Sequence, residues 1–178
     1  MDASTIVSVA DHYLRQFAAI VSPESMANIK QEMRSMGPTP KNKEELLSVI
    51  LGEDESDTTP AHLMRGVFFD HERRYPTNED IISHIEAMYP KIIQFAKDGE
   101  LDKAARWLGF VAGATLVEWG SYMNRREGYG YACAGAEFAK AAVTHNLIEA
   151  YLHLGFAQGT LWAIGAYTIN ELRGHNAP

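Results

Sequence analysis

Two clusters of arginine and tyrosine are the residues of this 178-residue chain best suited to holding a ligand. One is the run Arg125-Arg126-Glu127-Gly128-Tyr129-Gly130-Tyr131, and the other is Arg73-Arg74-Tyr75. Paired guanidinium groups can hold a phosphate or carboxylate through parallel hydrogen bonds, glycines let backbone N–H groups approach an anion, and tyrosine rings can stack on a base. If the clusters meet in space, they predict an anion site formed by Arg73, Arg74, Arg125, Arg126, Tyr129 and Tyr131. The alternative is a flexible connection between helices that carries surface arginines.

A second group of polar residues has the spacing of one helix face. His145, Glu149 and His153 recur every four residues, which brings successive side chains within about 6 Å of one another on a helix. Imidazole and carboxylate groups so placed are candidate ligands for a divalent metal. The alternative is a polar stripe on a helix whose other side is buried. The sequence favours this alternative, because a ferritin-like carboxylate bundle would need Glu-x-x-His on two helices and the chain has no such motif.

The remaining candidates for catalysis do not form a recognisable set. Acidic pairs at Glu44-Glu45 and in the run 53–55 could hold Mg²⁺ in an all-α nucleotide hydrolase, but a matching Glu-x-x-Asp on a following helix is missing. Cys133 lies among small residues, which indicates a packing role. Glycine loops that would cradle a phosphate are also missing, so we expect no cofactor. Whether the protein is an enzyme stays open, and the sequence favours a non-enzyme.

Composition and charge limit the kind of partner. The chain has 46% hydrophobic and 22% charged residues, and its 16 Lys and Arg against 23 Asp and Glu give a net charge of −7. This charge disfavours nonspecific binding to nucleic acid or to anionic lipid. A single cysteine, charges at Asp2, Asp11 and Arg15, and the lack of an 18-residue uncharged apolar run predict a cytoplasmic protein without a membrane segment.

Apolar residues recur at helical spacing almost throughout the chain. We expect helices near 4–21, 23–36, 43–51, 60–75, 77–97, 100–116 and 133–164, and a short last helix after Thr168. Pro90 should kink or break the fifth of these, and the acidic run 53–58 should be a solvated loop. The sequence therefore predicts one all-α domain over 1–178, a bundle of about six to eight helices. Residues 1–98 would form an N-terminal helical part, and 99–178 a long C-terminal helical hairpin.

The C-terminal half contains a possible internal repeat. The hexad Leu-Gly-Phe-x-x-Gly occurs at 108–113 and again at 154–159. Each Gly-x-x-x-Gly pair clears side chains from one helix face, so the two helices are expected to approach each other or a common partner closely. The copies are an ancestral pseudo-repeat or a chance recurrence. The same faces, together with Trp107, Trp119 and Trp162, could instead support a homo-oligomer.

The segment 154–176 resembles the closing segment of a loose group of small helical accessory proteins encoded by tailed bacteriophages and prophages. The shared pattern is LGFxQGxLWxxGxYTIxEL, and the whole segment covers 23 of the 178 residues. His153 stands where the group usually has a tryptophan before the Leu-Gly-Phe. The resemblance implies a phage context, but it implies no catalytic residues because the group has no common assigned activity.

Three hypotheses about function follow. The first is a non-enzymatic phage accessory protein in the host cytoplasm that binds and blocks a host protein, such as a component of antiviral defence. The second is a binder that sequesters a phosphate-bearing small ligand such as a nucleotide. The third is a Mg²⁺-dependent all-α nucleotide hydrolase. The partner would accordingly be a host protein or an anionic small ligand.

Overall fold

The computed structural model describes residues 1–17, 21–35, 76–119 and 125–177, and these form seven α-helices and no β-strand. The helices are α1 (Ala3–Phe17), α2 (Pro23–Arg34), α5 (Asn78–Lys97), α6 (Leu101–Trp119), α7 (Arg125–Ala142), α8 (Leu147–Ala163) and α9 (Ile169–His175). The predicted all-α bundle is confirmed. The helices expected near 43–51 and 60–75 and the acidic loop at 53–58 lie outside the described residues.

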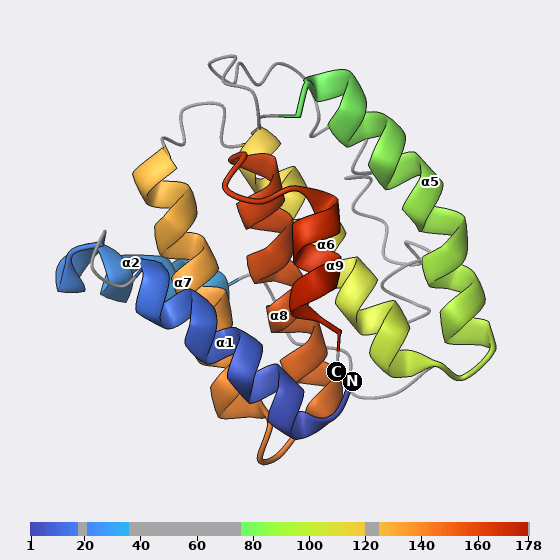
Figure 1. Cartoon of the computed structure of the whole chain (residues 1–178), viewed down its shortest axis with the longest axis horizontal. Helices are drawn as coiled ribbons and strands as arrows, with labels where there is room; N and C mark the ends of the chain where they lie inside the picture. The colour runs from blue at the N-terminus through green and yellow to red at the C-terminus, as the bar shows by residue number, and fades with distance from the viewer. Residues whose placement is uncertain (18–20, 36–75, 120–124, 178) are drawn as a thin grey trace.

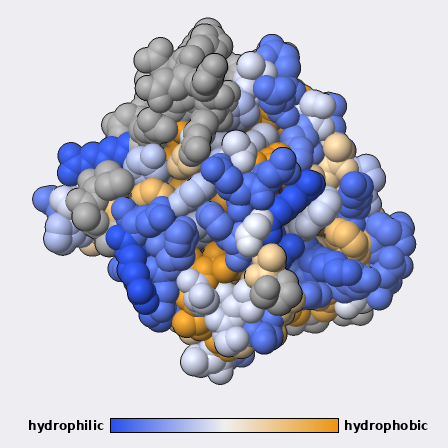
Figure 2. Space-filling view, viewed as in Figure 1, coloured by the Kyte–Doolittle hydropathy of each residue, from blue (hydrophilic) through white to orange (hydrophobic). Residues whose placement is uncertain are grey.

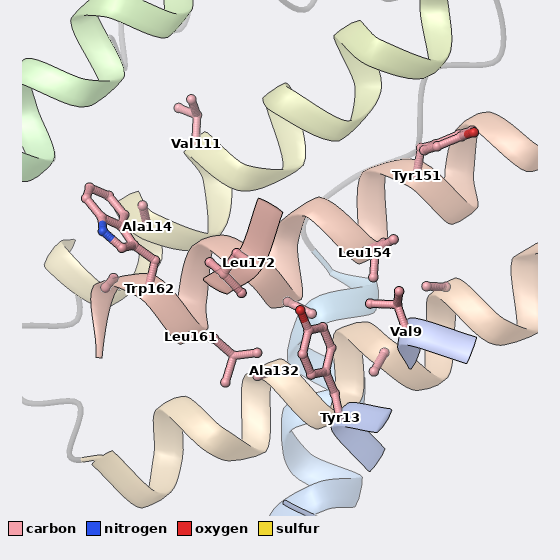
Figure 3. Packing of buried hydrophobic residues seen from close by; sticks show 14 of the residues in the cluster. Val9, Tyr13, Val111, Ala114, Ala132, Tyr151, Leu154, Leu161, Trp162 and Leu172 are labelled. Atoms are coloured by element: carbon pink, nitrogen blue, oxygen red, sulfur yellow. The ribbon is translucent and has the colours of Figure 1, made fainter. Parts of the chain in front are cut away.

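Helix α8 occupies the centre of the bundle (Figure 1). It packs against α6 on one side and α7 on the other, while α1 lies across α7 and α5 covers the outer side of α6. Every residue of α8 from Leu154 to Ala163 is buried, as expected for a helix that is apolar all round. Figure 3 shows Leu154, Leu161 and Trp162 of α8 among side chains from the neighbouring helices. On the face drawn in Figure 2, hydrophilic residues cover most of the described surface.

Most helix starts follow from their capping residues. Thr77 and Asp80 form a capping box at the start of α5, and Thr168 and Glu171 form another at the start of α9, both as the sequence predicts. Ser22 caps α2 ahead of a first-turn proline. The first helix begins earlier than expected, because the Asp2 carboxylate accepts a hydrogen bond from the backbone N–H of Thr5 at 2.9 Å.

Two expectations about helix boundaries are wrong, and a third is wrong in part. Helix α5 is not broken at Pro90, whose exposed position leaves the unpaired carbonyl of the preceding turn at a face open to water. The helix expected over 133–164 is two helices, because the chain turns after Ala142 and Asn146 caps the second by accepting a hydrogen bond from the Glu149 N–H. The run from Arg125, expected as a loop, is the first part of α7.

The two glycine motifs of the repeat face each other across the α6–α8 contact. A Cβ atom at Gly109 or Gly113 would lie 2.0 Å or 2.2 Å from a carbonyl oxygen of α8, and one at Gly155 or Gly159 would lie 2.0 Å or 2.1 Å from a carbonyl oxygen of α6. The backbones therefore touch without side chains between them. The predicted close approach is confirmed, and because it is made within one chain, the glycine faces give no support to a homo-oligomer.

Helix α6 carries a fully buried carboxylate near its C-terminal end. Neither carboxylate oxygen of Glu118 has a hydrogen-bond partner among the described residues, and the buried Thr115 hydroxyl one turn earlier has none either. Burial in this apolar setting raises the pKa of Glu118 from 4.5 to about 7. Within the described helices, none is both long and apolar enough to cross a membrane.

Candidate anion-binding site

The sequence-predicted arginine and tyrosine residues do not form an open ligand site where the structure describes them. The Tyr129 ring stacks on Phe17 with centroids 4.6 Å apart, and the buried Tyr131 donates a hydrogen bond to the Glu32 carboxylate. Burial, and then the contact with Glu32, raise the pKa of the Tyr131 hydroxyl. Arg126 is exposed on α7. Arg73, Arg74 and the Arg125 side chain lie outside the described residues, so a meeting of the two clusters stays a prediction.

Glycines in that run serve packing instead of ligand approach. A Cβ at Gly128 would lie 2.5 Å from the Ile164 side chain, and one at Gly130 would lie 2.3 Å from the Ile29 side chain. Both glycines therefore let α7 lie against its neighbours. This is the physical reason that a glycine-rich stretch is helical here.

The metal candidates form two pairwise contacts around one carboxylate. Glu149 Oε2 lies 3.6 Å from His145 Nε2, and Glu149 Oε1 lies 3.7 Å from His153 Nε2. His145 precedes the start of α8, so the three residues do not share one helix as expected. Burial lowers the pKa of His153. Among the described residues, no group of three or more His, Cys, Asp or Glu side chains is arranged to hold a metal ion.

A different site, which the sequence analysis did not single out, lies between α5, α6, α8 and α9. It is a cavity of about 200 Å³ whose lining carries three basic side chains, Lys91 from α5, Arg106 from α6 and Arg173 from α9. His84 of α5 also lines it, and none of the described lining residues is acidic. The cavity is therefore locally positive, although the chain as a whole has a net charge of −7.

Arg106 is the most enclosed of the three cations. Its side chain is half-buried, and within the described part of the chain its guanidinium makes no hydrogen bond or salt bridge. Burial lowers its pKa, which the nearby Tyr151 and Asp102 oppose. The Arg106 backbone is held in place because its carbonyl oxygen lies against Gly155, where a Cβ would be 2.0 Å away.

Lys91 and Arg173 approach the cavity from the outer helices. The Lys91 ammonium lies 5.6 Å from the centre of the Trp107 ring, a cation–π distance. Burial lowers the pKa of His84, and the positive charges of Arg173 and Lys91 lower it further. His84 is therefore kept neutral near neutral pH, and its environment shows that both cations are close to it.

Aromatic rings form an apolar side of the cavity. Phe110 and Trp107 of α6 line it directly. The Phe110 and Trp162 ring centroids lie 5.4 Å apart, and the His84 ring centroid lies 5.1 Å from that of Trp162. Such rings offer a surface on which a planar ligand can lie. Figure 3 places Trp162 beside Ala114 of α6, in the layer between α6 and α8.

Two side-chain amides, Gln158 and Asn176, complete the lining. The buried Gln158 donates from Nε2 to Asn176 Oδ1 at 2.9 Å and to the Tyr13 hydroxyl oxygen at 3.3 Å. Since Tyr13 accepts this bond, its own O–H is available to donate to His175 Nδ1, 3.1 Å away. With the hydroxyl donating, we expect His175 to carry its proton on Nε2.

Sequence reasoning missed this site because its cations come from three segments that are far apart in the chain. One signal was present, since Gln158 is a buried polar residue in the mostly apolar run of α8. No known protein family, curated protein or solved structure matches this chain.

Proposed function

We propose that the protein binds a small anionic ligand, carrying a phosphate or a carboxylate, in the cavity between α5, α6, α8 and α9. The observation that carries the proposal is the convergence of Lys91, Arg106 and Arg173 on one aromatic cavity whose described lining has no acidic residue. Hydrogen bonds between guanidinium groups and anions are among the stronger ones in proteins, and enclosure strengthens them further. This is the small-ligand hypothesis of the sequence analysis, located at different residues.

The state of Arg106 supports the same proposal. A guanidinium taken partly out of water without a hydrogen-bonded partner is unfavourable, and an anion in the cavity would supply the missing acceptors. The cavity of about 200 Å³ lies below the roughly 300–1,000 Å³ of most drug-sized pockets. The proposal is therefore for a compact ligand, or for the anionic end of a larger one.

The test measures binding by calorimetry and by thermal shift, using inorganic phosphate, benzoate and nucleoside monophosphates. At 100 times its dissociation constant, a true ligand should stabilise the fold by about 2.7 kcal/mol. Replacing Arg106→Gln should weaken binding by about tenfold to a hundredfold, because it removes a charged hydrogen-bond donor.

The matched control is Arg126→Gln, which removes an exposed arginine of α7 and also tests the originally predicted cluster. Equal weakening by both substitutions would show that general charge, and not this cavity, attracts the anion. Absence of binding by every anion in the panel would overturn the proposal.

The other two hypotheses stay predictions. The host-blocking hypothesis drew on the phage-like segment 154–176, on the acidic run 53–57 and on the lack of catalytic motifs, and the hydrolase hypothesis drew on Glu44, Glu45 and the run 53–55. Of these, the acidic residues lie outside the described residues. Phosphate release from a nucleotide that stops when Mg²⁺ is chelated would favour the hydrolase over a pure binder.

A further inference from the structure

We infer that the ligand of this cavity is a compact planar anion that also carries an N–H or O–H donor. The inference rests on the proposed function and adds the class of ligand. It depends on which atoms of Gln158 and Asn176 donate and which accept hydrogen bonds. The contact of Asn176 with one backbone carbonyl determines these directions.

The carbonyl oxygen of Leu172 fixes the orientation of the Asn176 amide. A carbonyl can only accept, so the Asn176 atom 2.9 Å from it must be the nitrogen, Nδ2. The other end of that amide, Oδ1, then faces Gln158 and must accept from Gln158 Nε2 at 2.9 Å. Both amide orientations follow from this single contact.

All four N–H groups of the amide pair are used within the protein. Asn176 Nδ2 donates to the Leu172 carbonyl and to Gln158 Oε1, and Gln158 Nε2 donates to Asn176 Oδ1 and to the Tyr13 hydroxyl. Each amide oxygen accepts one of these bonds and keeps one lone pair. The amide pair can therefore offer acceptors to a ligand and no donors.

The cavity consequently combines two opposite demands. Lys91, Arg106 and Arg173 can only donate hydrogen bonds, so they favour an anionic acceptor, whereas each amide oxygen can still accept one bond from a donor. Trp107 and Phe110 add a surface that suits a flat ring. A single aromatic or heteroaromatic ring that carries one acidic group and one hydroxyl or N–H group meets all three conditions in a cavity of about 200 Å³.

The experiment compares matched single-ring probes by calorimetry on the full chain. The probes are benzoate, 3- and 4-hydroxybenzoate, 3- and 4-methoxybenzoate, and 4-hydroxybenzamide. At least one hydroxybenzoate should bind about tenfold more tightly than benzoate and its own methoxy analogue, because one satisfied hydrogen bond is worth about that much. The uncharged hydroxybenzamide should bind more weakly than any benzoate.

A variant then tests the role of the amide pair. Asn176→Ala removes the Oδ1 acceptor and both hydrogen bonds that hold the Gln158 amide in its orientation, so it should lower the ratio of hydroxy to methoxy affinity. The wild-type ratio needs no variant, and it remains decisive if Asn176→Ala does not fold. Circular dichroism reports whether it does.

The outcomes separate this inference from the proposed function. Equal affinity for benzoate, hydroxybenzoates and methoxybenzoates would overturn the inference and leave anion binding in place. Binding of phosphate or nucleotides without any benzoate would do the same. Absence of binding by every anion would overturn both.

Discussion

The buried carboxylate of Glu118 gives the most quantitative prediction. Its pKa is about 7 in the folded protein and 4.5 ordinarily, so between these values the folded chain binds more protons than the unfolded chain. Stability must therefore fall as the pH rises from 4.5 through 7, and then level off. The two pKa values differ by about 2.5, and one pKa unit is worth about 1.4 kcal/mol, so Glu118 should cost about 3 kcal/mol at pH 8.

Replacing Glu118→Gln removes the charge and keeps the shape. Near pH 4.5 the variant and the wild type should have similar free energies of unfolding, because the wild-type carboxyl is then neutral in the fold. At pH 8 the variant should be more stable by about 3 kcal/mol. Urea unfolding of both proteins in steps from pH 4.5 to 8.5 measures this difference directly.

The control is Glu86→Gln, which removes an exposed carboxylate from α5. Its stability difference from the wild type should change little over the same range. If the difference between Glu118→Gln and the wild type is equally independent of pH, the buried carboxylate has found a partner or water, and the reasoning is refuted.

Three further predictions concern the fold and its hydrogen bonds. Gly113→Ala and Gly155→Ala should each destabilise the fold by about 1–3 kcal/mol or more, because the added Cβ would overlap a carbonyl oxygen of the facing helix. Gly174→Ala, where a Cβ would have nothing within 4 Å, should instead stabilise it by about 0.5–1 kcal/mol. Thermal unfolding that ranks Gly174→Ala among the damaging variants would contradict this. Thr168→Ala should cost about 1 kcal/mol by removing the cap of α9, and a urea midpoint unchanged from the wild type would count against the capping box. Burial and the nearby His12 lower the pKa of His175, so the contribution of neutral His175 to stability should be lost as the pH falls below 6.5. At neutral pH, NMR should find the His175 proton on Nε2. A proton on Nδ1 would contradict the direction assigned to the Tyr13 hydrogen bond.

The parts of the fold that sequence reasoning predicted are those with a local cause. The capping boxes at Thr77 and Thr168 need only residues three positions apart, and the close approach of α6 to α8 follows from glycines four positions apart. The boundary at Asn146 was also locally encoded, but the apolar pattern continues across it and concealed the cap. Local rules therefore gave the helices and their closest contact.

The start of α7 and the candidate site required information from distant residues. Gly128 and Gly130 indicated a loop in the sequence. In the fold, the side chains of Ile164 and Ile29 pack against them and explain why this segment is helical. The positive charge at the cavity depends on how four helices pack, and no spacing in the sequence connects Lys91 with Arg173. The buried Gln158 in the mostly apolar α8 was a local sign of the site.

The backbone contact between α6 and α8 divides the cavity into a constrained and a permissive half. Arg106 on α6 and Gln158 on α8 lie on two helices whose backbones are in direct contact, so neither residue can shift without disrupting that contact. Lys91 and Arg173 project from outer helices without this restriction. Over evolutionary time, changes in ligand preference should accumulate on α5 and α9, while the central pair keeps its geometry and sets what every ligand must share.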